Sequence, residues 1–162
     1  MSVKKNKDIK LSDLLKEKFI DLDLQKSTKN KVIAELIELI AGSKKLTDKK
    51  SFSRAMQSRE KLGSTGIGDG VAIPHAKSEA VKDFILVFAR RDEGIDFDAL
   101  DGEKTFLFFA LASPKDEIGM HLKILSEISR LVKDKFIVEL LKKAQDKKEV
   151  LRIITEMEKR LT

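Results

Sequence analysis

The feature that most constrains the fold is a pair of apolar runs in the second half of the chain, at residues 84–89 and 106–112. Both consist only of phenylalanine, leucine, isoleucine, valine and alanine, without the polar residue at every second position that a half-exposed strand carries. Runs of this kind are typical of central strands that are covered on both faces. The segment between them, rich in glycine and aspartate at residues 94–102, predicts a turn-rich connection.

In most of the remaining chain, apolar residues recur at the spacing of an α-helix. Five segments have it, at approximately residues 27–41, 48–63, 117–133, 135–144 and 146–160. Ser27 is the expected N-cap of the first helix. The alternation of apolar and acidic residues in Phe19–Leu24 predicts a short strand. Strands interleaved with helices predict an α/β domain with a single mixed, mostly parallel central sheet of about five strands, flanked by helices on both faces.

Composition excludes several kinds of site. The chain contains no cysteine, so disulfides, thiolate catalysis and cysteine-based metal sites are impossible, and His75 and His121 are its two histidines. Residues 1–10 are charged and polar without the apolar segment of a signal peptide. No stretch approaches the roughly 18 apolar residues of a membrane span. We therefore expect a cytoplasmic protein with no direct membrane insertion.

The net charge of +6 is distributed unevenly along the chain. Residues 1–50 carry 13 basic and 8 acidic side chains, residues 51–132 carry 11 and 13, and residues 133–162 carry 9 and 6. The basic excess thus lies in the terminal helical regions, where solvated helix faces account for it. Tyrosine and tryptophan are absent, which weakens a base-stacking interpretation. We expect no nucleic-acid partner, and an affinity that falls steeply with salt and survives loss of His75 would contradict this.

The segment Gly66–His75 is the most informative in the chain. Its glycines can turn backbone N–H groups into one concavity and form an anion-binding nest, with His75 beside it. Pro74 fixes the backbone immediately before the imidazole. The order of elements and the glycine spacing do not fit a dinucleotide-binding loop, and the Gly-Lys-Ser/Thr ending of a P-loop is missing. From these residues alone, an ordinary turn followed by a surface histidine is the more common alternative and stays open.

Two further residues have both a functional and a structural interpretation. His121 lies near the start of a predicted helix, at the edge of its buried stripe, where it could be a partly buried histidine bonded to a backbone carbonyl. Arg59 could be one more solvated cation on its helix. Neither residue is assigned a role by spacing alone.

The stretch REKLGSTGIGDGVAIPHAK at residues 59–77 resembles the active-site signature of the type-2 IIA domain of the phosphoenolpyruvate-dependent sugar phosphotransferase system. GIDFDALDG at 94–102, Ser113-Pro114 and HLKIL at 121–125 resemble the same family in order and spacing. The resemblance covers nearly the whole chain, and implies one domain over residues 1–162 with its core at about 10–160.

The resemblance implies that His75 is the phosphorylated residue, that Arg59 clamps the phosphoryl oxygens, and that His121 orients the group or His75. It implies no metal and no organic cofactor. A loop of backbone donors at Ser64, Thr65, Gly66, Gly68 and Gly70 is expected to help bind the phosphoryl group. The donor would be an HPr-like phosphocarrier, and the next acceptor a cysteine of the IIB component of a sugar permease. The docking surface is expected to be apolar, with Val71, Ala72 and Ile73 at its rim.

Two functions remain open at this point. The first is a phosphocarrier for uptake of a fructose-like sugar, which the Ala76-Lys77 pair and the Phe-Asp-Ala-Leu-Asp-Gly stretch favour because they resemble fructose-type members. The second is a nitrogen-regulatory IIA-type protein, in which the phosphorylation state of His75 controls binding to regulatory partners. The sequence does not identify the sugar, because a IIA component never contacts it.

Overall fold

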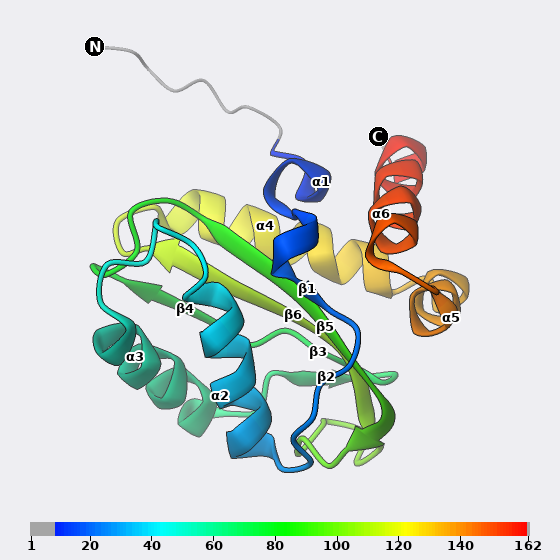
Figure 1. Ribbon diagram of the computed structural model, residues 1–162, viewed down its shortest axis with the longest axis horizontal. Coiled ribbons are helices and arrows are strands. Elements are labelled where there is room, and N and C mark those ends of the chain that lie inside the picture. The colour runs from blue at the N-terminus through cyan, green and yellow to red at the C-terminus, as the bar shows by residue number, and fades with distance from the viewer. Residues whose placement is uncertain (1–8, 162) are drawn as a thin grey trace.

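The computed structural model describes residues 9–161, so most of the polar segment 1–10 lies outside the described residues. A single six-stranded sheet forms the centre of the molecule, and its strands follow the order β1-β5-β6-β3-β2, with β4 also pairing with β6 (Figure 1). The strands are β1 (Ile20–Asp21), β2 (Gly66–Gly68), β3 (Val71–Ala72), β4 (His75–Ser78), β5 (Ile85–Ile95) and β6 (Thr105–Pro114).

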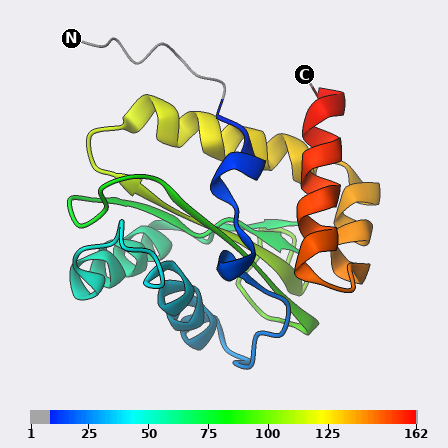
Figure 2. The ribbon, with the colours of Figure 1, turned by 45° about the horizontal axis from the view of Figure 1, so that its top comes forward.

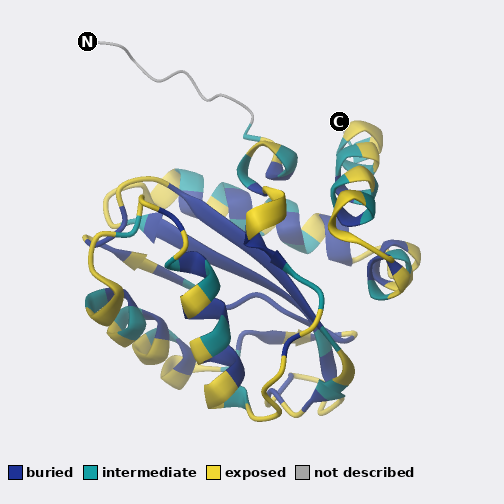
Figure 3. Cartoon of the chain, in the orientation of Figure 1, coloured by how far each residue is buried: buried dark blue, intermediate teal, exposed yellow. Residues whose placement is uncertain are grey.

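The two predicted apolar runs lie in β5 and β6, the long central pair, and β5 continues beyond its run through charged residues to Ile95. They are antiparallel, with Phe88 opposite Phe109, and their rings lie 4.9 Å apart between centroids. Nearly every residue of both runs is buried, because helices cover both faces of the sheet (Figure 3). The continuous apolar pattern therefore has the cause expected from the sequence.

Helices lie on both faces of the sheet. The pair α2 (Lys29–Ile40) and α3 (Lys49–Leu62) covers one face, and α4 (Ile118–Val132) covers the other, as Figure 2 shows with α4 above the sheet. The chain ends with α5 (Lys135–Lys143) and α6 (Lys147–Leu161). The predicted fold class is confirmed, and three of the five strand pairings are parallel.

Some helices and strands begin or end at other residues than the sequence predicted. The N-cap of α2 is Thr28 and not Ser27. α3 begins close to its predicted start near Thr47 or Asp48, and the side chain of its N-cap, Asp48, accepts a hydrogen bond from the backbone N–H of Ser51 at 3.1 Å. The predicted strand at 19–24 shortens to β1, which follows a 3-10 turn (Glu17–Phe19), and a short helix, α1 (Leu11–Leu14), was not predicted.

The glycine-rich segment contains three short strands that the sequence did not predict. Gly68, Asp69 and Gly70 have φ angles of +95°, +54° and +81°, and this left-handed turn joins β2 to the antiparallel β3. Gly66 is required for another reason, because a Cβ there would lie 2.9 Å from the Cα of Ala99. After Pro74 the chain enters β4, which lies parallel to β6 with His75 opposite Leu111.

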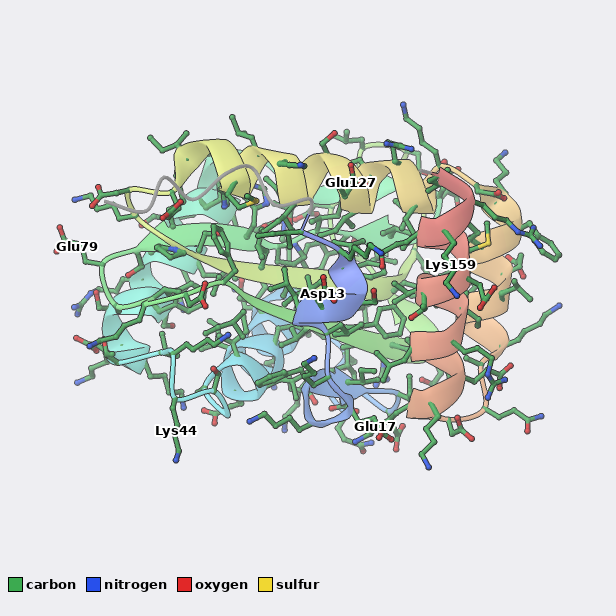
Figure 4. The ribbon with its side chains drawn as sticks, turned by 90° about the horizontal axis from the view of Figure 1, so that it is seen from above. Asp13, Glu17, Lys44, Glu79, Glu127 and Lys159 are labelled. Atoms are coloured by element: carbon green, nitrogen blue, oxygen red, sulfur yellow. The ribbon has the colours of Figure 1, made fainter. Side chains whose placement is uncertain are left out.

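Charged side chains cover the outside of this layered core. Figure 4 shows Lys44 and Glu79 at the margin of the molecule, directed away from the sheet, and both are exposed. Within residues 9–161, no helix is long and apolar enough to cross a membrane.

Candidate functional site

His75 begins β4, at the place where α3 and α4 approach the sheet from opposite faces. Its Nδ1 lies 2.7 Å from the carbonyl oxygen of Ile73. A carbonyl only accepts, so Nδ1 carries the proton of the neutral ring, and the lone pair is on Nε2. The Nε–H of Arg59 donates to that lone pair over 3.3 Å, which fits the same tautomer. The hydrogen bond to the backbone thus leaves the lone pair of the neutral ring on Nε2.

Arg59 reaches this position from the last turn of α3. Its Nη1 also donates to the carbonyl oxygen of Gly63, just beyond the helix end, at 3.0 Å. This second bond satisfies a carbonyl that the helix leaves free and holds the guanidinium between the helix terminus and His75. The arginine that is sixteen residues away in sequence therefore directly contacts the imidazole.

The environment keeps His75 neutral. Burial is the largest cause that lowers its pKa below 6.5, and the positive charges of Arg59 and Lys77 act in the same direction. The hydrogen bond to Ile73 and the negative charge of Glu60 oppose the shift. Because the net pKa shift is downward, the imidazole is uncharged at neutral pH and its Nε2 lone pair is available.

His121 lies in the first turn of α4 and faces the same site. Its ring centroid is 5.5 Å from that of His75, and its Nδ1 is 2.7 Å from Oγ of the buried Ser113. Burial, then the charges of His75 and Lys77, lower the pKa of His121 to about 4. The structure thus joins His75, Arg59 and His121, with both imidazoles neutral at physiological pH.

The three residues lie in a shallow pocket of about 400 Å³ with an apolar rim. Leu62 of α3 is 85% exposed and Leu122 of α4 is 59% exposed, and both line it. The rim expected from the sequence was wrong. Val71, Ala72 and Ile73 are buried, because β3 is an interior strand between β2 and β6.

The glycine-rich loop does not reach the pocket in the way the sequence suggested. Val71 is opposite Leu107 and His75 is opposite Leu111 on the same strand, so the turn at Gly68 and Gly70 is about 13 Å away along the sheet.

The backbone N–H groups of Thr65 and Gly66 and the hydroxyls of Ser64 and Thr65 are already used inside the protein. Ser64 Oγ donates to the Phe97 carbonyl, the N–H and hydroxyl of Thr65 donate to Glu60, and the N–H of Gly66 donates to Ser64 Oγ. The expected phosphoryl-binding role of Ser64, Thr65, Gly66, Gly68 and Gly70 therefore does not fit the structure.

Sequence reasoning missed two residues of this site. Lys77 lies two residues after His75 on β4, so both side chains are on one face of the strand, and Lys77 lines the pocket. Its charge lowers the pKa of both histidines. Ser113, at the end of β6, holds His121. The alternation of β4 would have indicated Lys77 if that four-residue strand had been predicted.

The arrangement of His75 and Arg59 is suited to phosphoryl transfer. A neutral imidazole with its lone pair beside a guanidinium can attack an electrophilic phosphorus, while the cation stabilises the phosphoryl oxygens. Among residues 9–161, no group of three or more histidine, cysteine, aspartate or glutamate side chains is placed to hold a metal ion.

Comparison with known proteins agrees with this chemistry. Residues 13–157 match the family described as phosphoenolpyruvate-dependent sugar phosphotransferase system, EIIA 2. The fructose-specific EIIABC component of Bacillus subtilis (strain 168) is 33% identical over 151 residues, which are 93% of this chain and 24% of that protein. This chain thus spans about a quarter of that relative's length.

Solved structures show the same fold. The nitrogen regulatory protein IIA-Ntr from Neisseria meningitidis superposes with a TM-score of 0.83 at 33% identity, over 89% of this chain and 98% of that one. The mannitol IIA of Escherichia coli, solved in complex with phosphorylated IIB, has a TM-score of 0.75 at 24% identity, over 88% of this chain and 99% of that one. The match over residues 13–157, together with these relatives, shows that the chain belongs to the EIIA type-2 family of the phosphoenolpyruvate-dependent sugar phosphotransferase system.

Proposed function

We propose that this protein is a phosphocarrier that accepts a phosphoryl group on Nε2 of His75 and passes it to a second protein. One observation carries the proposal most directly. The Ile73 carbonyl holds the proton of His75 on Nδ1, and this leaves the Nε2 lone pair beside the Arg59 guanidinium. A surface histidine without a function needs neither the fixed tautomer nor the cation.

The transfer step follows from this geometry. The Nε2 lone pair attacks the phosphorus of a phosphohistidine on an HPr-like phosphocarrier, in line with the bond that breaks. The electron pair of that bond returns to the donor's ring nitrogen, so atoms and charge balance. As phosphorus arrives, Arg59 moves its donors from Nε2 to the phosphoryl oxygens, and the Nδ1–H bond to Ile73 stabilises the positive charge that develops on the ring.

His121 has a separate role in this proposal. Its ring lies 5.5 Å from that of His75, at a distance where it can donate to a phosphoryl oxygen once the group is in place. Ser113 fixes its orientation through Nδ1. Because the pKa of His121 is about 4, it acts as a neutral donor and adds no charge.

The surface around the pocket supports a protein partner. Exposed Leu62 and Leu122, with exposed Ile118 nearby on α4, give an apolar surface around a small cationic centre. Such a surface suits a protein partner whose own active site carries the phosphoryl group. The HPr-like carrier would dock here first, and the IIB component of a permease would then take the group onto a cysteine, in the cytoplasm.

A fructose-like uptake system is the branch we favour, because the EIIABC relative is fructose-specific by name and resembles this chain over 93% of its length. The second candidate is a nitrogen-regulatory protein, since the Neisseria structure has 33% identity and a TM-score of 0.83. In that case the phosphorylation state of His75 would control binding to a regulatory partner.

The test is a reconstituted relay. The protein is incubated with phosphoenolpyruvate, the first enzyme of the relay and HPr, and its intact mass is measured before and after addition of a fructose-type IIB domain. We expect one phosphoryl group per chain, removed by IIB. Failure to accept the group would contradict the phosphocarrier function, and acceptance without onward transfer to any IIB domain would favour the regulatory branch.

A further inference from the structure

A buried carboxylate lies directly behind the site, and the steps proposed above do not use it. Glu60 follows Arg59 in α3, and successive helical residues point about 100° apart, so the two side chains leave the helix in different directions. It is 8% exposed. One oxygen, Oε1, lies 2.9 Å from both the Thr65 N–H nitrogen and Lys29 Nζ, and Oε2 accepts from the Thr65 hydroxyl at 2.6 Å.

The positions of Lys29 and Glu60 in their helices are not those expected of an ion pair that stabilises the fold. Lys29 is the first residue of α2 and Glu60 lies in the last turn of α3, so each charge opposes the dipole of its own helix. Exchanging a buried ion pair for apolar residues is often neutral or stabilising. A contribution to stability therefore does not explain why these two charges lie here.

The hydrogen bonds continue from Glu60 to the nucleophile. The carbonyl of Thr65 accepts from the N–H of Ile73 at 2.9 Å. The carbonyl of Ile73 then accepts from Nδ1–H of His75 at 2.7 Å. His75 Nε2 accepts from Arg59, and Arg59 is joined to Glu60 by a peptide bond. The bonds thus form a closed ring through Glu60, Thr65, Ile73, His75 and Arg59.

We propose that Glu60 and Thr65 are positioning residues for phosphoryl transfer, which fix the imidazole of His75 and the guanidinium of Arg59 in one rigid frame, with Lys29 neutralising the buried carboxylate. This proposal rests on the proposed phosphocarrier function. A displacement of about 1 Å between reacting groups can cost about a hundredfold in rate, so a frame that fixes both groups has a kinetic value separate from stability.

The chain offers a matched pair of variants. Thr65→Val removes the hydroxyl bond to Glu60 and keeps the shape of the side chain. Thr105→Val is the same change at a fully buried threonine of β6 whose hydroxyl has no hydrogen-bond partner among residues 9–161. Thr65→Ser retains the hydroxyl and serves as the conservative rescue. Glu60→Gln is a second route, because it keeps the volume and an acceptor but removes the charge.

Two measurements are needed on each variant. The first is the single-turnover rate of transfer from phosphorylated HPr as a function of HPr concentration. The second is the ¹⁵N spectrum of the His75 imidazole in the unphosphorylated protein, which reports the tautomer without any partner. We expect Thr65→Val and Glu60→Gln to lower the saturated rate about tenfold, without changing the half-saturating HPr concentration, and to reduce the Nδ1–H population. Thr65→Ser and Thr105→Val should stay within about twofold of wild type.

The outcomes separate this proposal from the phosphocarrier function itself. Wild-type rates and spectra in folded Thr65→Val would overturn the positioning role, as would a slower rate with an unchanged His75 spectrum. An equal loss in Thr105→Val would also overturn it, because the effect would then belong to any buried threonine. If the wild-type protein accepts no phosphoryl group, the phosphocarrier function fails, and the imidazole spectra still test whether Glu60 and Thr65 fix the tautomer.

Discussion

The low pKa of His121 makes the stability of this protein depend on pH in a way that one substitution should remove. In the unfolded chain His121 has a pKa near 6.5, and in the folded protein burial, followed by the charges of His75 and Lys77, lowers it to about 4. Between these values the unfolded chain binds a proton that the folded protein does not. Stability contributed by the neutral ring is therefore complete above about pH 6.5 and is lost as the pH falls toward about 4.

The size of the loss follows from the shift. Each pKa unit corresponds to about 1.4 kcal/mol, so the full difference is about 3 kcal/mol, of which about 2 kcal/mol is already lost at pH 5. His121 is 4% exposed, so solvent screens this little. A loss of 2 kcal/mol is a substantial part of the 5–15 kcal/mol or so that stabilises a typical domain.

The perturbation is His121→Asn, which keeps a polar atom near the Nδ1 position for Ser113 but cannot titrate. The assay is urea unfolding at pH 7 and pH 5 by circular dichroism, with the free energy of unfolding extrapolated to water. We expect wild type to lose about 2 kcal/mol more than His121→Asn over this interval, since all other titrating groups are shared. Ser126→Asn, an exposed change on the same helix, should follow wild type. Equal pH dependence in wild type and His121→Asn would refute the reasoning.

Three further predictions concern Arg59, His121 and the apolar rim, and their readout is the single-turnover transfer rate from HPr. Every variant is first shown to be folded. Arg59→Gln should lower the transfer rate about a hundredfold or more, because the charge that stabilises the phosphoryl oxygens is gone, and Arg59→Lys should recover only part of that rate. A wild-type rate in Arg59→Gln would mean that Arg59 is only a solvated cation on its helix. His121→Ala should lose about tenfold to a hundredfold, and an unchanged rate would leave His121 as an ordinary helix residue. Leu122→Asp should raise the half-saturating HPr concentration with little change in the saturated rate. If the apolar rim controls docking, the wild-type transfer rate should also fall by less than about tenfold from low to moderate salt. A fall of several orders of magnitude would mean that charge steering, and not the apolar rim, controls docking.

The parts of the fold that the sequence predicted are those whose pattern extends over many residues. The runs that became β5 and β6 are apolar at every position because both faces are covered, and the long helices show a repeated apolar spacing. Strands β2, β3 and β4 have two to four residues each, too few to establish a period. β3 and β4 pair with β6, and β2 pairs with β3, so the positions of all three depend on partners that only the folded chain provides.

The site was predictable in its residues but not in its supporting contacts. His75, Arg59 and His121 came from a family resemblance, and the structure brings all three to one pocket. The loop glycines were assigned to phosphoryl binding because backbone donors were assumed to be free, whereas the donors of Ser64, Thr65 and Gly66 bond inside the protein.

The error about the docking rim has a similar origin. Apolar character does not distinguish a buried strand such as Val71–Ala72 from an exposed apolar surface such as that around Leu122. The distinction depends on what packs against each residue, and this is a property of the tertiary structure.

The account depends above all on which nitrogen accepts the phosphoryl group. The direct measurement is NMR of ¹⁵N-histidine-labelled protein after phosphorylation by HPr, which assigns the phosphoryl group to a residue and to one ring nitrogen, with His75→Ala as the control. We predict a single phosphoryl group on Nε2 of His75, stable in base and labile in acid, with the Nδ1–H still donating to the carbonyl of Ile73. A group on Nδ1 of His75, on His121 or on Ser64, or continued phosphorylation of His75→Ala, would contradict the account.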